Sequence, residues 1–230
     1  MKRAGIIGGI APESTVDYYR SIVREYRRRN APGYPSLLIN SIDLQRLMDM
    51  VNAARFEEFA SWLVDEVEVV EKAGADFAAF ASNTPHIVFE EVQRRSRLPM
   101  LSIVDVTCAE AKRLHLRRLA LLGTRFTMLG RFYPDTFARE GIAIVLPEQE
   151  DLEFVHEKYF GELVNAVFLP ETRAAILQVI ARIRERHAID GVILAGTELP
   201  LLLRGHDPAE LQMLDTTHIH VRAIVDTILS

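Results

Sequence analysis

The chain has 230 residues, of which 49% are hydrophobic and 26% charged, and its net charge is −5. Acidic and basic residues are interspersed, which leaves no basic patch for nucleic acid or an anionic membrane. The single cysteine, Cys108, cannot form an internal disulfide, and no run of about 18 apolar residues could span a bilayer. We therefore expect a cytoplasmic protein that binds neither nucleic acid nor a membrane.

In the first half of the chain, short apolar runs alternate with longer amphipathic segments. The runs predict strands at 4–7, 36–42, 76–81 and 100–104. The amphipathic segments predict helices at 12–26, 54–73 and 84–95. Gly8-Gly9 follows the first strand as a turn, and Gly74 ends the second helix.

The second half of the chain repeats the alternation. Strands are predicted at 118–122, 142–146, 191–195 and 212–214, and helices at 126–140, 152–166, 170–187 and 217–229. Strands separated by helices of this length are typical of βαβ units. The sequence therefore predicts an α/β fold with parallel sheets.

The two halves also share their spacing. Gly8 and Ser82 are 74 positions apart, and Gly123 and Gly196 are 73 positions apart. All four residues come directly after, or at the end of, an apolar strand, and polar residues and a helix-like run follow Ser82 and Gly196. We interpret the halves as one α/β unit used twice.

Such a repeat predicts two lobes related by a pseudo-two-fold axis. The predicted lobes are 1–105 together with the returning segment 211–230, and 106–210. In open α/β sheets the carboxyl ends of the strands border the ligand site. The turns after the strands at 76–81 and 191–195 would then face one cleft between the lobes.

Ser82, Asn83 and Thr84 are the first candidate site residues. Small polar side chains and backbone amides at a helix start suit a carboxylate. N-capping by Ser82 or Thr84 would explain the same residues, so both interpretations remain open. His86 lies in the first turn of the following helix, where a lone histidine is more often structural than functional.

The glycine-rich turn at 8–15 carries neither the G-x-G-x-x-G spacing of a dinucleotide site nor a P-loop. It therefore predicts no nucleotide cofactor, although Gly9 could border a ligand. The corresponding segment at 122–127 places the hydroxyl of Thr124 after a strand in the same way. The histidines show no zinc spacing, so we expect no metal site.

Five segments in order resemble the aspartate/glutamate racemase family, and they span essentially the whole chain. They are 5–15, 82–86, 121–128, 196–203 and 214–220. The segment Ser-Asn-Thr-Pro-His at 82–86 resembles a family motif that normally reads Cys-Asn-Thr-Ala-His. The segment Gly-Thr-Glu at 196–198 resembles a second motif that normally reads Gly-Cys-Thr-Glu.

The resemblance implies two Rossmann-like lobes, chemistry without a cofactor, an amino acid or small carboxylate as ligand, and a homodimer. Ser82 takes the place of the first catalytic cysteine and Gly196 the place of the second, with Thr197 and Glu198 beside it. The residues carried over as catalytic are Ser82, Thr197 and Glu198. Those carried over as substrate-binding are Gly9, Asn83, Thr84, His86, Thr124, Gly196 and Thr197.

Cofactor-free racemisation needs one acid–base group on each face of the α-carbon. A thiol with a pKa of about 8.5 can supply thiolate near neutral pH, whereas a serine hydroxyl needs an adjacent base and a glycine offers nothing. Three functions therefore remain open: a racemase or epimerase without two thiols, a lyase, decarboxylase or isomerase in the same cleft, and a non-catalytic carboxylate-binding protein. We expect the double change Ser82→Cys with Gly196→Cys to raise racemisation.

In the family, basic residues near the cleft hold the distal carboxylate of the substrate. The candidates in this chain are Arg46, Arg55, Arg125 and Lys158.

Overall fold

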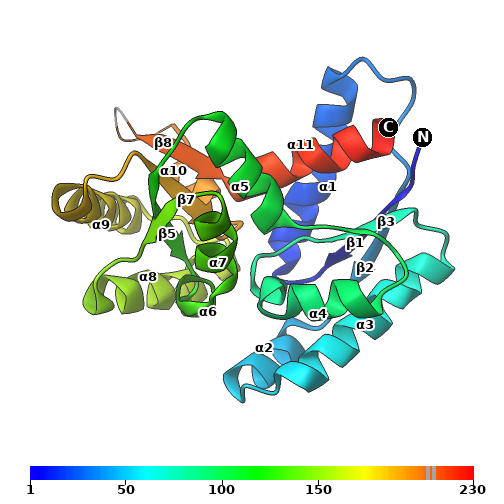
Figure 1. Ribbon diagram of the computed structural model, residues 1–230, viewed down its shortest axis with the longest axis horizontal. Helices are drawn as coiled ribbons and strands as arrows, with labels where there is room; N and C mark the ends of the chain where they lie inside the picture. The colour runs from blue at the N-terminus through cyan, green and yellow to red at the C-terminus, as the bar shows by residue number, and fades with distance from the viewer. Residues whose placement is uncertain (206–207, 209–210) are drawn as a thin grey trace. The chain divides into compact units, whose positions relative to one another are not determined.

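The computed structural model describes residues 1–205, 208 and 211–230, and it divides the chain into two units. The first unit comprises Met1–Ile103 and His220–Ser230, and the second comprises Val104–Ile219. Each unit contains its own parallel sheet with helices packed on it (Figure 1). The predicted α/β class with parallel sheets is confirmed.

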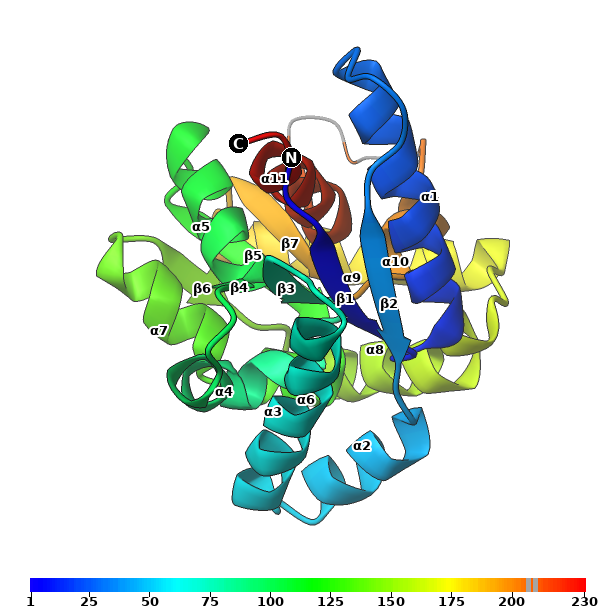
Figure 2. The ribbon, with the colours of Figure 1, turned by 90° about the vertical axis from the view of Figure 1, so that its right-hand side faces the viewer.

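The sheet of the first unit has the strand order β2-β1-β3-β4, and all its pairs are parallel. Figure 2 shows β2, β1 and β3 running side by side. The strands are β1 (Ala4–Gly8), β2 (Leu37–Ser41), β3 (Phe77–Phe80) and β4 (Met100–Leu101). The helical elements are α1 (Pro12–Arg28), α2 (Leu44–Asn52), α3 (Phe56–Lys72), η1 (Thr84–Val88), α4 (Phe89–Arg95) and the greater part of α11 (Thr216–Leu229).

The first sheet is covered on both faces, which explains why β1 and β3 are uninterrupted apolar runs. Ala4 and Ile6 of β1 belong to a buried cluster with α1 and α11. Gly5 points to the other face, where a Cβ atom would come within 2.7 Å of Val70 Cγ2 in α3. The close approach of α3 thus requires a glycine in β1.

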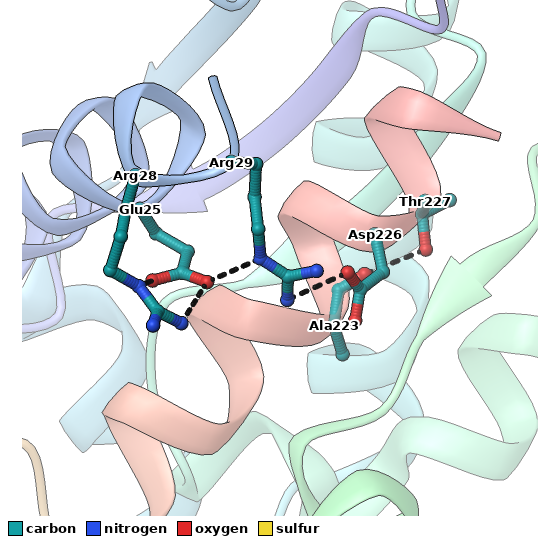
Figure 3. Close-up of polar contacts among 6 residues, drawn as sticks. All are labelled: Glu25, Arg28, Arg29, Ala223, Asp226 and Thr227. Atoms are coloured by element: carbon teal, nitrogen blue, oxygen red, sulfur yellow. Dashed lines mark hydrogen bonds and ion pairs between the residues drawn. The ribbon is translucent and has the colours of Figure 1, made fainter. Parts of the chain in front are cut away.

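An ion-pair cluster joins the end of α1 to α11 in the first unit (Figure 3). The buried Glu25 carboxylate accepts hydrogen bonds from Arg28 Nε at 2.7 Å and Arg29 Nε at 2.8 Å. Arg29 also pairs with Asp226 of α11 at 2.9 Å. The hydrogen bond from Arg28 is the main reason that the pKa of Glu25 falls to about 2.

The sheet of the second unit repeats the same order, β6-β5-β7-β8, again with parallel pairs throughout. Its strands are β5 (Arg118–Gly123), β6 (Ala143–Val145), β7 (Gly191–Ala195) and β8 (Gln212–Asp215). Its helical elements are α5 (Ile103–Arg113), α6 (Arg125–Leu129), α7 (Phe132–Arg139), α8 (Gln149–Gly161), η2 (Leu163–Asn165), α9 (Pro170–His187), α10 (Leu199–Leu203) and the first residues of α11.

Several details differ from the sequence prediction. The segment 211–219 lies in the second unit, since β8 pairs with β7. The predicted helix at 126–140 is two helices, because Gly130 adopts an extended backbone between α6 and α7. The predicted strand at 100–104 is the two-residue β4, and α5 begins at Ile103. Helix α2 had no counterpart in the prediction.

Within the described part of the chain, no helix is both long and apolar enough to cross a membrane.

Candidate functional site

Two candidate residues of the first unit lie at one edge of its sheet. Strands β1 and β3 are neighbours in parallel register, with Ile7 opposite Phe80. The Ala81 amide continues this pairing by donating to the Ile7 carbonyl at 2.9 Å. Gly9 and Ser82 therefore both follow the carboxyl ends of adjacent strands, the edge at which α/β sheets bind ligands.

The polar turn after β3 is buried. Ser82, Asn83 and Thr84 expose 7%, 3% and 8% of their surfaces. Asn83 occupies the N-cap position of η1, and within the described residues no side chain caps this helix. The N-cap position of η1 therefore belongs to Asn83 and not to Ser82 or Thr84, whose buried hydroxyl groups lie at the carboxyl edge of the sheet.

Gly9 is required by the backbone itself. Its φ angle is +88°, and a Cβ atom there would lie 2.8 Å from the Ile42 amide nitrogen and 2.9 Å from Ser41 Oγ. Its own amide donates to Thr15 Oγ1 at 2.7 Å. The geometry explains this glycine by the tight turn from β1 into α1, since the turn passes against the end of β2.

His86 is a buried, neutral residue whose hydrogen bonds connect the turn after β3 to the start of α5. The Ile103 amide donates to His86 Nε2 at 3.3 Å, so Nδ1 carries the proton and donates to the Asn83 carbonyl at 3.2 Å. The ring also stacks on Phe89 at 4.7 Å. Burial lowers the pKa of His86 to about 3. Nδ1 thus ties the ring to the Ser82–Thr84 turn, and Nε2 ties it to the start of α5.

His220 has a comparable role that the sequence reasoning missed. The Tyr18 hydroxyl lies 3.0 Å from Nδ1, and the Leu101 carbonyl lies 3.2 Å from Nε2. Because a carbonyl can only accept, Nε2 carries the proton and Nδ1 accepts from Tyr18. Burial lowers the pKa of His220 to about 4. Its only sequence signal was its place in the family-like segment 214–220.

The second unit builds an equivalent edge from β5 and β7, where Gly123 lies opposite Ala195. A Cβ atom at Gly123 would come within 2.6 Å of the Ala195 carbonyl oxygen, so the strand ends touch. Thr124 follows directly and caps α6, accepting from the Thr127 amide at 3.3 Å. N-capping thus explains the side chain of Thr124.

Gly196, Thr197 and Glu198 follow β7 at this second edge, and Thr197 and Glu198 are buried. The Thr197 hydroxyl donates to Glu198 Oε2 at 2.7 Å. The Tyr159 hydroxyl from α8 donates to the same oxygen. Burial, together with the adjacent Glu198 carboxylate, raises the pKa of Tyr159 well above its usual range.

Tyr159 also fills the space beside Gly196. A Cβ atom at Gly196 would lie 2.8 Å from the phenol oxygen and 2.9 Å from Cζ of the ring. The sequence reasoning missed Tyr159, because its place beside the 196–198 turn arises only when α8 packs on the second sheet. No motif in the sequence indicated it.

The four basic candidates for a distal carboxylate all have partners within their own units. The Arg46 guanidinium lies over the Trp62 ring at 4.7 Å. Arg55 pairs with Glu58 at 2.8 Å, Arg125 with Glu153 at 3.2 Å, and Lys158 with Glu162. Arg125 alone of the four directly follows a strand-end turn, at Thr124.

The side chains that could serve metal or thiol chemistry are the His, Cys, Asp and Glu residues. The described residues contain no group of three His, Cys, Asp or Glu side chains arranged to hold a metal ion. Cys108 is buried in α5, and this burial raises the pKa of its thiol to about 11. Such a thiol is protonated at neutral pH and is a poor nucleophile.

Comparison with known proteins finds relatives that match this chain over nearly its whole length. Residues 7–224 match the model of the Asp/Glu/Hydantoin racemase family. The chain is 26% identical to the broad specificity amino-acid racemase RacX of Bacillus subtilis, covering 98% of each. It also matches a solved aspartate racemase homologue from Pyrococcus horikoshii, at 35% identity and a TM-score of 0.86, and a candidate Asp/Glu racemase from Yersinia pestis, at 29% and 0.90, with full coverage of each chain. The chain therefore belongs to the Asp/Glu/hydantoin racemase family.

Proposed function

We propose that this chain binds a small amino acid or a related carboxylate and acts on it by amino-acid racemase or epimerase chemistry without a cofactor. The candidate segments are the polar turns that end β3 and β7, with Asn83, Thr84 and Thr197 as ligand-binding residues and Ser82, Thr197 and Glu198 as catalytic residues. We further propose that the chain is a cytoplasmic homodimer.

One observation carries the proposal. Two sheets with the same strand order both end in buried polar turns at equivalent strands, β3 and β7. Burying hydroxyl and carboxylate groups costs free energy unless they are satisfied, so such turns are typical of ligand sites. The match to an amino-acid racemase over nearly all of both chains supports the choice of ligand class.

The chemistry in this proposal cannot use two thiols. Ser82 offers a hydroxyl that can donate a proton but is a weak base, and Gly196 offers no side chain. We therefore expect racemisation to be slow. The loss of an acid–base group on one face removes a factor of about 10²–10⁴.

A non-catalytic binding protein is the second candidate. The Tyr159 ring beside Gly196 favours it, because the ring occupies the place from which a side chain at position 196 would extend. Thr197 and Glu198 fit either function. A hydroxyl and a carboxylate that are hydrogen-bonded to each other can serve both to bind a ligand and to transfer a proton.

Exchange of the α-proton in D₂O, followed by NMR and chiral chromatography, tests these candidates. D- and L-aspartate, D- and L-glutamate, malonate and small keto acids are first screened by thermal shift. Racemisation of a stabilising amino acid supports the proposed function. Stabilisation without exchange supports the binding protein, and consumption of the ligand supports a lyase or decarboxylase. The proposal fails if no compound raises the Tm.

A further inference from the structure

The Tyr159 side chain packs in the core of the second unit, and the end of its ring lies beside Gly196 in the turn after β7. It exposes 6% of its surface and packs in a cluster with Leu163 and Leu199. Its Cε2, Cζ and hydroxyl are the atoms that approach Gly196. The Tyr159 ring therefore packs against the core, while its hydroxyl end contacts the turn after β7.

The tip is held by a second constraint. The Tyr159 hydroxyl donates to Glu198, which also accepts from Thr197. To move away from position 196, the ring would have to give up this hydrogen bond and its packing in a dense core. The space beside Gly196 is thus filled by a side chain that cannot easily leave.

We propose that Tyr159 is a specificity-determining residue of this site: its ring takes the volume that a side chain at position 196 would need, and its hydroxyl orients the Glu198 carboxylate. Gly196 and Tyr159 then form a coupled pair: the effect of a substitution at one position depends on the residue at the other. This inference rests on the proposed function only for its effect on the ligand, because the steric coupling is a property of the fold.

The coupling changes the expectation drawn from the sequence. Cysteines introduced together at positions 82 and 196 would place a new Cβ against the Tyr159 ring, where no room exists. We therefore expect Ser82→Cys with Gly196→Cys to fail in raising racemisation while Tyr159 is present. Adding Tyr159→Leu should relieve the contact, since leucine lacks the Cε2, Cζ and hydroxyl atoms that approach Gly196.

The first experiment measures coupling through stability alone. Gly196→Ala is made in the wild-type, Tyr159→Phe and Tyr159→Leu backgrounds, and the Tm of each full-length protein is recorded. Phenylalanine keeps the ring and loses the hydroxyl, so only leucine both loses the hydrogen bond and opens the space. We expect Gly196→Ala to lower the Tm by several degrees in the first two backgrounds and by less than half as much in the third.

Gly161→Ala serves as the matched control, because it lies in the same helix as Tyr159 and a Cβ there would meet no atom within 4 Å. Its effect should be the same in all three backgrounds. An equal loss of Tm for Gly196→Ala in all three backgrounds would overturn the inference, whatever the ligand proves to be.

The second experiment measures the effect on chemistry. Ser82→Cys with Gly196→Cys is combined with tyrosine, phenylalanine or leucine at position 159, and α-proton exchange is followed with the amino acid that stabilises the wild type. We expect at least a tenfold faster exchange with leucine than with tyrosine or phenylalanine. Equal rates in variants that still bind the ligand would overturn the role in specificity.

The two experiments separate the inference from the proposed function. If no amino acid or carboxylate raises the Tm of any variant, the proposed function fails, while the stability measurements still decide whether Tyr159 and Gly196 are coupled.

Discussion

The carboxyl edges of the two sheets are built on the same plan and differ in what covers them. At the first edge Ser82 keeps a small hydroxyl, and His86 supports its turn from within the unit. At the second edge Gly196 has no side chain, and Tyr159 fills the space instead. A repeated topology therefore fixes where two turns lie and leaves the chemistry of each to side chains that pack from elsewhere.

The two units also differ in their expected response to acid, which is the largest effect predicted. His86 and His220 in the first unit have pKa values of about 3 and about 4, compared with an ordinary 6.5. The unfolded chain takes up protons first as the pH falls below 6.5, so stability is complete above that pH and is lost below it. Both histidines together should cost about 3 kcal/mol between pH 6.5 and pH 5.

Urea denaturation at pH 7, 6 and 5 checks this loss, and His220→Gln sharpens it. Glutamine can donate to the Leu101 carbonyl and accept from the Tyr18 hydroxyl without titrating. We expect the variant to lose about half as much stability as the wild type over this pH range. An unchanged pH dependence would show that His220 does not carry the acid sensitivity of the first unit.

Gly9→Ala tests whether the first edge needs its glycine as strictly as the second needs Gly196. The positive φ angle and the contact with the Ile42 amide should together cost about 3 kcal/mol, measured by urea denaturation. Gly33→Ala is the control, with φ +72° and no atom within 4 Å of the new Cβ. It should cost about 1–2 kcal/mol from backbone strain alone. Equal losses would contradict the steric argument.

Glu25→Gln tests whether the stability of the first unit can be lowered without changing ligand binding. The pKa of Glu25 is about 2 instead of 4.5, so its contribution is present above pH 4.5 and lost as the pH falls toward 2. Solvent screens Arg28, whose side chain is 66% exposed, so we expect a loss of about 2 kcal/mol at pH 7 by urea denaturation.

Glu68→Gln is the matched control for that change, because Glu68 and Lys72 form an ion pair between exposed side chains at 2.7 Å. Its effect should be much smaller than that of Glu25→Gln, because solvent screens an ion pair between two exposed side chains. Ligand-induced thermal shifts should be the same in both variants and the wild type. A weakened shift in Glu25→Gln alone would mean that the end of α1 is coupled to the ligand edge.

Ser82→Cys, made alone, is the smallest expected effect and the most direct comparison of the two edges. Exchanging a hydroxyl for a thiol at a small buried side chain should change the stability by less than about 1 kcal/mol. Gly196→Cys, made alone, should lower the Tm much more because of Tyr159. If differential scanning calorimetry gives the same loss of Tm for both variants, Tyr159 does not make the second edge less tolerant of a new side chain than the first.

Most of the fold followed from local pattern. The strands at 191–195 and 212–215 agree with the prediction within one residue, because buried parallel strands are short apolar runs between polar turns. The prediction failed where neighbours decide the structure. Strand β4 is cut to two residues by the start of α5, and β8 joins the second sheet through its pairing with β7.

The sequence by itself determined the α/β class, the repeat and the positions of Ser82, Asn83, Thr84, Thr197 and Glu198 after strand ends, because periodicity and turn chemistry are local. Only the tertiary structure decided what those residues meet. The ring of Tyr159 lies beside Gly196, and His220 lies between Tyr18 and the Leu101 carbonyl. Such contacts join residues far apart in the chain, and helix packing alone brings them together.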